Sequence, residues 1–183
     1  MEQPGIGTLK EIEEFESVPI EERLKFSNTY DLIKNGVSLN PEALALSFIL
    51  SGEHYNEPME VSYRDLMTNV NRAANLFHDV GVGPGDVISY LLPNLPQTHY
   101  IFWGGEAAGI INPINPLLEP SAIRDICQAV GTKVMVSLGE YPGSDIWEKV
   151  IAIRKDLPNL KSIIRVIGPS DEKDGILGFD EVI

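Results

Sequence analysis

Residues 86–120 read DVISYLLPNLPQTHYIFWGGEAAGIINPINPLLEP, and this stretch decides the fold. The apolar run at 87–92, β-branched at its start, has the profile of a buried strand. Pro96 suits the first turn of a helix, and the segment 96–108 is apolar on nearly every side, which predicts a buried helix. A second strand follows at 110–113. Strand, helix and strand form a βαβ unit, and such units build a parallel sheet with right-handed crossovers.

Apolar runs and helix-period segments alternate over the rest of the chain. In the segment 63–80 apolar residues recur every three or four positions, which marks one face of a helix. The alternation predicts a three-layer α/β fold, in which a mostly parallel sheet carries an added N-terminal β-hairpin. The expected strands cover 43–49 and 60–63 in the hairpin, and 87–92, 110–113, 133–137 and 162–166 in the sheet. The expected helices cover 63–80, 96–108, 121–130 and 145–156.

Several residues predict where these elements begin and end. Ser27 or Asn28 is expected to cap a helix that stops at Asn35-Gly36. Asp145 is expected to cap the helix that follows it. Pro113 prevents its strand from continuing as a central one, because proline cannot donate a hydrogen bond to a neighbouring strand.

The first 26 residues are rich in glutamate and poor in basic residues. This composition predicts a solvated acidic arm at 1–26, with one helical turn. The folded domain is expected to occupy 27–183, which is the length of a single domain.

Charge and composition narrow the classes of function. A net charge of −13 argues against nucleic acid or an anionic membrane as a partner, since both require a basic patch. The single cysteine rules out an internal disulfide framework and a cysteine-based zinc cluster. The sequence shows neither a signal peptide nor an uninterrupted apolar run of about 18 residues. We therefore expect a cytoplasmic chain without a transmembrane segment.

Most of the usual catalytic motifs are absent from the sequence. The glycines of 81–85 precede a strand, and Gly131-Thr132-Lys133 enters one, so neither segment has the context of a phosphate-binding loop. No Gly-x-Ser-x-Gly motif occurs. Cys127 lies on the apolar face of its predicted helix, which indicates core packing rather than a reactive thiol. The three histidines are scattered and form no metal-binding motif: His54, His78 and His99.

Five segments stand out in sequence order: VSYRDL at 61–66, VGVGPGDVI at 80–88, LPN at 92–94 with AAGIINPINP at 107–116, PSAI at 120–123 and KVMV at 133–136. Each segment is a weak signal alone, but five in the right order and spacing are hard to obtain by chance. Together they resemble the N-terminal part of the adenylate-forming, AMP-dependent acyl-CoA synthetases. The resemblance covers roughly residues 28–170.

The resemblance implies acid–thiol ligase chemistry. Such enzymes join a carboxylate to ATP, which gives an acyl-adenylate and pyrophosphate, and then pass the acyl group to coenzyme A. Magnesium accompanies the nucleotide, and its role is charge neutralisation and positioning of the phosphates. ATP, magnesium and CoA are thus implied for the intact family member, in fatty acid metabolism, and no cofactor is expected for these 183 residues alone.

The sequence departs from the family in the parts that carry the chemistry. The Ser/Thr/Gly-rich phosphate loop with its lysine, the later acidic motif, the hinge and the catalytic lysine of the small domain have no counterpart here. We therefore expect residues 27–183 to be a partial domain, truncated before the phosphate loop, whose partner is the missing C-terminal portion. No catalytic or cofactor-binding residue is carried over. The residues to test first are polar or aromatic, and a structural role as turn and packing residues is favoured for them: Asn94, His99, Trp103, Asn112 and Asn115.

Three interpretations stay open. The chain is the N-terminal portion of an acyl-CoA synthetase and inactive alone, or a stand-alone non-catalytic binding or interaction module derived from that scaffold. The third alternative is a small α/β nucleotide-binding protein unrelated to ligases. The sequence identifies neither the carboxylic acid nor the oligomeric state, and it does not separate a natural truncation from a fragment of a longer product.

Overall fold

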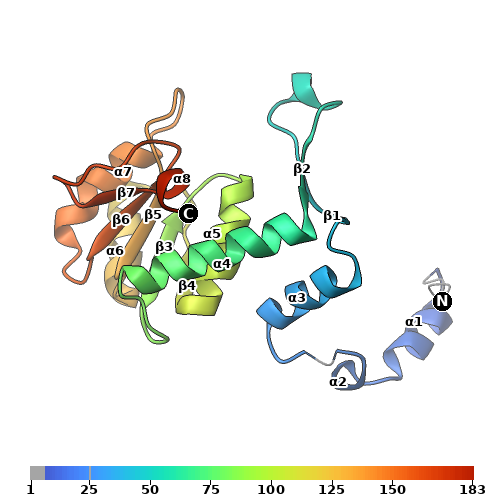
Figure 1. Cartoon of the computed structure of the whole chain (residues 1–183). Coiled ribbons are helices and arrows are strands. Elements are labelled where there is room, and N and C mark those ends of the chain that lie inside the picture. Colours follow the sequence, from blue (N-terminus) through green and yellow to red (C-terminus); the bar gives the residue numbers. More distant parts are fainter. Residues whose placement is uncertain (1–6, 25) are drawn as a thin grey trace.

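The main sheet contains five parallel strands in the order β4-β3-β5-β6-β7 (Figure 1). The computed structural model describes residues 7–24 and 26–183. The strands are β3 (Val87–Leu91), β4 (Ile110–Pro113), β5 (Val134–Leu138), β6 (Ser162–Val166) and β7 (Ile176–Gly178). The helices of this part are α4 (Tyr63–Asp79), α5 (Pro96–Ala108), α6 (Pro120–Val130), α7 (Ile146–Ile153) and α8 (Phe179–Val182).

Helices cover both faces of this sheet, which confirms the predicted three-layer α/β fold. The connection from β3 to β4 runs toward one edge, whereas those from β4 to β5 and from β5 to β6 run the opposite way. Right-handed crossovers therefore place α5 on one face and α6 and α7 on the other. Helix α4 packs along α5 (Figure 1). Strand β4 lies at the edge of the sheet, as Pro113 predicted.

Helix α5 is sandwiched between α4 and the sheet, and two glycines make the fit possible. A Cβ atom added at Gly104 would lie 2.8 Å from the carbonyl oxygen of Val70 and 2.7 Å from the Cβ of Ala73, both on α4. One added at Gly105 would lie 2.6 Å from the Cδ1 of Ile111 on β4. Close packing on two sides explains why this segment is apolar nearly all round and tolerates two residues of poor helix propensity.

The core lies between the sheet and its two helical layers. Strand β5, in the middle of the sheet, is buried along its whole length, which matches the continuous apolar run of its sequence. The largest fully buried side chains come from both helical layers, the strands and α8: Phe77, Phe179, Ile88, Leu91, Ile101, Ile123, Met135 and Ile164.

The predicted hairpin is present but forms a separate sheet. Strands β1 (Leu44–Phe48) and β2 (Met59–Ser62) pair antiparallel and are joined by a loop that contains the short helix η1 (Gly52–His54). Val61 is its one buried apolar residue. The hairpin stands out from the end of α4, so its tip projects away from the main sheet (Figure 1).

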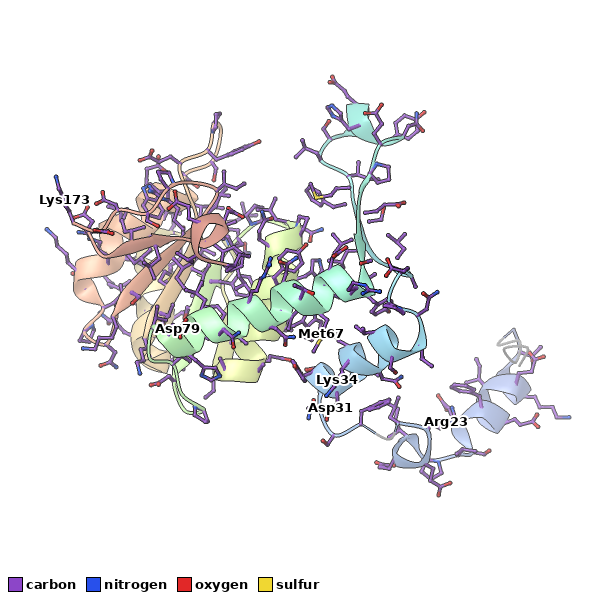
Figure 2. All side chains as sticks on the ribbon, viewed as in Figure 1. Arg23, Asp31, Lys34, Met67, Asp79 and Lys173 are labelled. Carbon is purple, nitrogen blue, oxygen red and sulfur yellow. The ribbon has the colours of Figure 1, made fainter. Side chains whose placement is uncertain are left out.

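The acidic N-terminal region is more helical than the sequence predicted. In place of one turn it contains α1 (Leu9–Glu16) and α2 (Ile20–Arg23); residues 1–6 and 25 of the predicted arm lie outside the described residues. Thr8 and Glu11 form a capping box, in which the Thr8 N–H donates to the Glu11 carboxylate at 2.8 Å. Neither helix has a buried residue, and both lie apart from the main sheet (Figure 2). The boundary at residue 26 stays a prediction.

Helix α3 (Thr29–Leu39) does not stop at Asn35-Gly36, so that prediction is wrong. Its start is correct, because the Asn28 side chain accepts the Asp31 N–H at 2.8 Å. The helix continues through Gly36, where the ring of Tyr63 packs so closely that an added Cβ would lie 2.7 Å from that ring. A glycine that reads as a helix stop is in fact a contact point with α4.

Two smaller predictions also need correction, and one strand was missed. The Asp145 side chain caps no N–H of α7 but lies 3.1 Å from the ammonium group of Lys149. The helix expected over 145–156 consists of α7 and a short 3₁₀ helix, η2 (Arg154–Asp156). Strand β7 was not predicted, because three residues ending in glycine carry too little pattern to signal a strand.

Candidate functional site

The order of the strands singles out one place on the sheet. From β3 the chain moves outward to β4, then returns across β3 to reach β5. The loops that follow β3 and β5 therefore leave the carboxyl ends of two neighbouring strands toward opposite faces of the sheet. In open parallel sheets, the crevice at the carboxyl ends of such a pair is where ligands bind.

A cleft of about 680 Å³ lies at this position. The turn after β3 contributes Pro93-Asn94-Leu95, and the loop after β5 contributes residues 141–144. The end of β6 adds Ile167, and residues 47–50 of the hairpin form the opposite wall. Four segments that are far apart in the sequence thus meet around one opening.

The cleft is mostly apolar, with a few polar groups at its rim. Leu138 and Ile146 are buried at its base, whereas Leu50 is 67% exposed and Tyr141 is 48% exposed at its mouth. Asn94 adds an amide to this lining. Apolar walls with a small number of polar groups are typical of sites for small organic molecules.

The start of α5 borders this cleft and lacks a side-chain cap. Its N-cap residue is Leu95, which has no acceptor, and the Thr98 hydroxyl donates instead to the Pro93 carbonyl at 2.7 Å. Backbone N–H groups in the first turn are therefore left without a capping side chain, an arrangement that favours a carboxylate or phosphate oxygen nearby.

Ile167, at the rim of the cleft, has an unusual backbone conformation. Its φ is +59°, which is disfavoured for a β-branched residue. The Ile167 N–H donates to the Asp180 carboxylate at 3.1 Å, which holds the turn in place. Strain of about 1–3 kcal/mol is expected at such a residue, and it occurs most often at ligand-binding or switch sites. Nothing in the sequence signals this conformation.

The five residues singled out from the sequence do not form one site. Only Asn94 lines the cleft. His99 and Trp103 are partly buried on α5, where burial lowers the pKa of the His99 imidazole. Trp103 packs edge-on against Phe102, with ring centroids 4.7 Å apart. Trp103 also packs against the hydrophobic core, which agrees with the packing role favoured for it.

Asn112 and Asn115 also have structural roles. The Asn112 amide donates to the Ser89 hydroxyl at 2.9 Å, between neighbouring strands. That hydroxyl lies 2.7 Å from the hydroxyl of Thr132 in a buried polar cluster. The Asn115 side chain accepts the Leu117 N–H at 3.0 Å and so fixes a turn.

Cys127 is 1% exposed and lies beside the same cluster. Burial raises the pKa of its thiol, which keeps the sulfur protonated and unreactive near neutral pH. The prediction of core packing is confirmed.

The histidines do not group together, and the hydrogen-bonding distances of His54 and His78 are to different partners. Nδ1 of His54 lies 2.8 Å from the Ser51 hydroxyl, and Nδ1 of His78 lies 3.2 Å from the Val82 carbonyl. Within residues 7–24 and 26–183, no three His, Cys, Asp or Glu side chains are grouped so that they could hold a metal ion.

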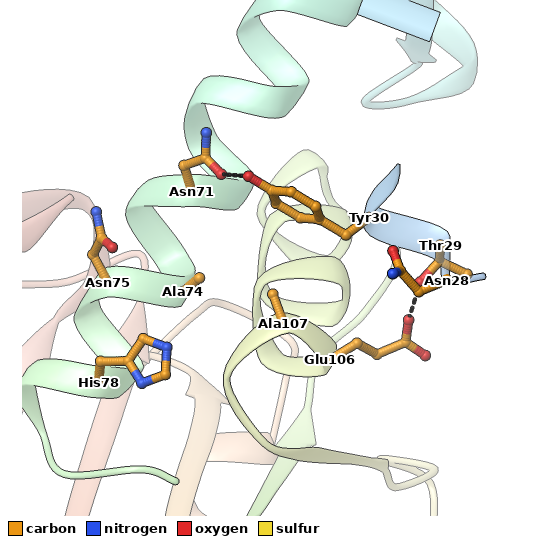
Figure 3. A pocket seen from close by; sticks show the side chains of 9 residues that line it. All are labelled: Asn28, Thr29, Tyr30, Asn71, Ala74, Asn75, His78, Glu106 and Ala107. Carbon is orange, nitrogen blue, oxygen red and sulfur yellow. Dashed lines mark hydrogen bonds between the residues drawn. The ribbon is translucent and has the colours of Figure 1, made fainter. Parts of the chain in front are cut away.

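A second opening of about 680 Å³ lies between α3, α4 and α5 (Figure 3). Its polar groups tie the helices together: the Tyr30 hydroxyl donates to Asn71 at 2.9 Å, and the Thr29 hydroxyl donates to Glu106 at 2.7 Å. We interpret this opening as the seam along which α3 docks on the two longer helices.

Sequence analysis missed the hairpin wall, Tyr141, Ser144 and Ile167 as lining residues. These residues belong to no motif. A topological argument from the predicted βαβ units could have located Tyr141, Ser144 and Ile167, which follow strands of the main sheet, but not the hairpin wall, which belongs to a separate sheet.

None of the helices in the described part of the chain combines the length with the apolar character that a membrane crossing requires.

Comparison with known proteins gives consistent matches. A model of the family described as "AMP-binding enzyme" matches residues 34–182. Marinolic acid–CoA ligase of a Pseudoalteromonas species is 26% identical over 167 residues, which are 91% of this chain and 26% of that relative. Crotonobetaine/carnitine–CoA ligase of Proteus mirabilis is 38% identical over 74 residues, which are 38% of this chain and 14% of that relative. The chain thus spans 26% or less of the length of these curated relatives.

Solved structures show the same fold. Acetoacetyl-CoA synthetase from Streptomyces lividans superposes with a TM-score of 0.74 at 24% identity, over 85% of this chain and 24% of its own. An anthranilate CoA ligase in complex with anthranoyl-AMP superposes with a TM-score of 0.71 at 20% identity, over 91% of this chain and 28% of its own.

Proposed function

The chain belongs to the family of AMP-binding enzymes, and from this premise we propose that it is the N-terminal portion of an ATP-dependent acyl-CoA ligase. In the intact enzyme a carboxylate reacts with ATP to give an acyl-adenylate and pyrophosphate, and the acyl group then passes to the CoA thiol with release of AMP. The observation that carries the proposal is the alignment with a CoA ligase over 91% of this chain but only 26% of the relative.

The described residues suit a scaffold better than a site for magnesium and ATP. They contain no metal-binding group of three side chains, and the sequence has no glycine-rich phosphate loop followed by lysine. We therefore assign ATP, magnesium and CoA to the intact ligase and derive no chemical step from this chain. Its contribution is the parallel sheet, with a mostly apolar cleft at the carboxyl ends of β3 and β5.

Two experiments test this proposal. In the first, the purified chain is incubated with ATP, Mg²⁺ and a panel of fatty and aromatic acids, and pyrophosphate release is compared with a control without protein. We expect no carboxylate-dependent release, because the groups that hold the phosphates are absent. Turnover that follows the protein through purification would show that the chain is catalytic by itself.

The second experiment replaces the aligned segment of the marinolic acid–CoA ligase with this chain. Acyl-CoA formation by the chimera would support the scaffold role. The matched control carries Phe77→Ala, which removes a fully buried side chain of the sheet core and should abolish turnover. A folded but inactive chimera would favour the alternative of a stand-alone binding or interaction module.

The proposal extends to a cytoplasmic enzyme of fatty acid metabolism whose partner is the C-terminal portion of the ligase. The chemistry of the parent family supports this extension. The same acid panel, applied to the active chimera, tests the substrate class, and fractionation of cells that express the tagged chain tests the compartment.

A further inference from the structure

A third cavity, of about 470 Å³, lies between α7, β6 and the loop that precedes β7. It shares no lining residue with the apolar cleft at the carboxyl ends of β3 and β5. Its walls carry three cationic side chains, Arg154, Lys155 and Arg165, together with the indole of Trp147. Three carboxylates, Glu140, Asp171 and Asp174, line the same cavity, so its wall carries as many acidic as basic side chains.

Arg165 is held rigidly at the base of this cavity. Its guanidinium carbon lies 5.1 Å from the centre of the Trp147 ring. Its aliphatic part runs between Gly139 and Gly168, where added Cβ atoms would lie 2.9 Å from its Cγ and 3.0 Å from its Nε. A guanidinium fixed in this way loses little further side-chain freedom when it binds an anion.

The hydrogen-bonding capacity of Arg165 is only partly used. One terminal nitrogen donates to the Pro169 carbonyl, whereas the Nε–H is buried without an acceptor. Arg165 forms no ion pair with any carboxylate that the structure describes. Because the Nε–H is closed off from solvent, the donors left for a ligand are the remaining N–H groups of the two terminal nitrogens.

The acidic side chains around the cavity are largely engaged elsewhere. Asp174 pairs with Arg154 at 3.4 Å, and Asp171 accepts the Lys173 N–H at 3.1 Å in a turn. Glu181 accepts the Ser170 N–H at 2.8 Å. Glu140, which also lines the cavity, is exposed to solvent. Arg165 and Lys155 therefore remain as the cations without a carboxylate partner among the described side chains.

We propose that this cavity binds the phosphate group of a small phosphorylated molecule, with Arg165 as the main donor and Lys155 as a second cation. Arginine suits this role because its planar fork donates two parallel hydrogen bonds to phosphate oxygens. A volume of about 470 Å³ exceeds the need of one phosphate and leaves room for a sugar-sized group beside Ile151. The inference does not depend on the ligase assignment.

The test is a titration of the isotopically labelled 183-residue chain at constant ionic strength, followed by NMR of the Trp147 indole N–H and the Arg165 Nε–H. The probes are inorganic phosphate, ribose 5-phosphate, ribose and acetate. We expect saturable shifts with the two phosphates, none with ribose, and weaker binding of acetate. Saturation by inorganic phosphate but not by ribose 5-phosphate would support a site for free phosphate and reject the sugar-sized group.

Variants distinguish specific binding in the cavity from a general effect of the protein's charge on phosphate. Lys155→Gln removes an exposed cation of the lining and should weaken phosphate binding about tenfold or more. Arg165→Lys keeps the charge and most of the packing but loses the fork, and should weaken binding at least as much. The matched control is Lys173→Gln, on the neighbouring loop, whose side chain points to solvent (Figure 2) and should leave affinity unchanged. Absence of saturation, or an equal loss in Lys173→Gln and Lys155→Gln, would overturn the proposal.

Discussion

The body of the molecule, from α4 to α8 (63–183), and its N-terminal segment, from α1 to β2, differ most in how they treat apolar side chains. In the described part of the chain, thirteen of the nineteen exposed large apolar residues belong to the N-terminal segment, which is about a third of the sequence. Helices α1, α2 and α3 contain no buried residue. The body thus holds its own core, whereas the N-terminal segment gains little stability from burial.

This difference teaches that regular secondary structure and stability have separate origins here. Helix α1 has a complete capping box at its N-terminal end, yet its apolar side chains face solvent. Helix α5 has no side-chain cap but lies between α4 and the sheet. Tertiary packing, rather than capping or propensity, supplies most of the stability of a helix.

The same substitution in the two regions should have very different effects. Phe77→Ala in α4 empties a side chain that is 0% exposed and should lower the free energy of unfolding by about 3–5 kcal/mol. Phe15→Ala in α1, where the ring is 43% exposed, should change it by less than about 0.5 kcal/mol. Urea unfolding followed by circular dichroism measures both. Similar losses for the two variants would mean that the N-terminal segment unfolds as one unit with the body.

A second pair of variants tests close approach. Gly104→Ala forces a Cβ to within 2.8 Å of the Val70 carbonyl oxygen and should cost about 1–3 kcal/mol, although alanine favours a helix. Gly52→Ala at the hairpin tip, where nothing lies within 4 Å of the added Cβ, is the matched control and should be nearly neutral. If Gly104→Ala raised the melting temperature, the α4–α5 packing described above would be wrong.

Ile167 is the exception within the body, because it carries strain. Ile167→Asn places at this turn a residue that tolerates a positive φ, so the strain should be relieved. The Ile167 side chain is partly exposed, so its removal costs little apolar burial. The free energy of unfolding should therefore rise by about 0.5–1 kcal/mol. Thermal unfolding compares this variant with Ile110→Asn, which replaces another exposed isoleucine at ordinary φ and should not stabilise. Equal effects would show that the φ angle stores no strain.

Acid titration should affect the two regions in different ways, through the melting temperature for the body and through the helix content for α1. Hydrogen bonding to Lys133 holds the pKa of Asp86 below its usual value, and the Thr8 hydroxyl does the same for Glu11. A lowered carboxyl pKa contributes stability above the unfolded pKa, and this stability is lost as pH falls through the folded pKa. Below about pH 4, protonation of Asp86 should lower the melting temperature of the body, whereas protonation of Glu11 should only fray α1.

The control for this titration is Asp86→Asn, which should flatten the dependence of melting temperature on pH, whereas Glu11→Gln should leave it unchanged. Helix content at constant melting temperature reports the fraying of α1. A pH dependence that survives Asp86→Asn would assign the acid loss to other carboxylates.

The sequence by itself determined the architecture of the body. Alternating apolar runs and helical faces located every strand of the main sheet except β7, and the boundaries of α5 agree residue for residue with the prediction. Such patterns succeed because a strand or helix buried on a known face must carry its apolar residues at the period of its own geometry.

Only the tertiary structure decided which residues of different elements contact one another. Gly36 lies inside a helix where Tyr63 packs on it, and Ile167 takes a positive φ that no local pattern encodes. The cleft and the Arg165 cavity each combine segments that lie far apart in the chain. The physical reason is that periodicity reports whether a residue is buried, whereas contact partners depend on strand order and helix packing, which single-sequence patterns do not specify.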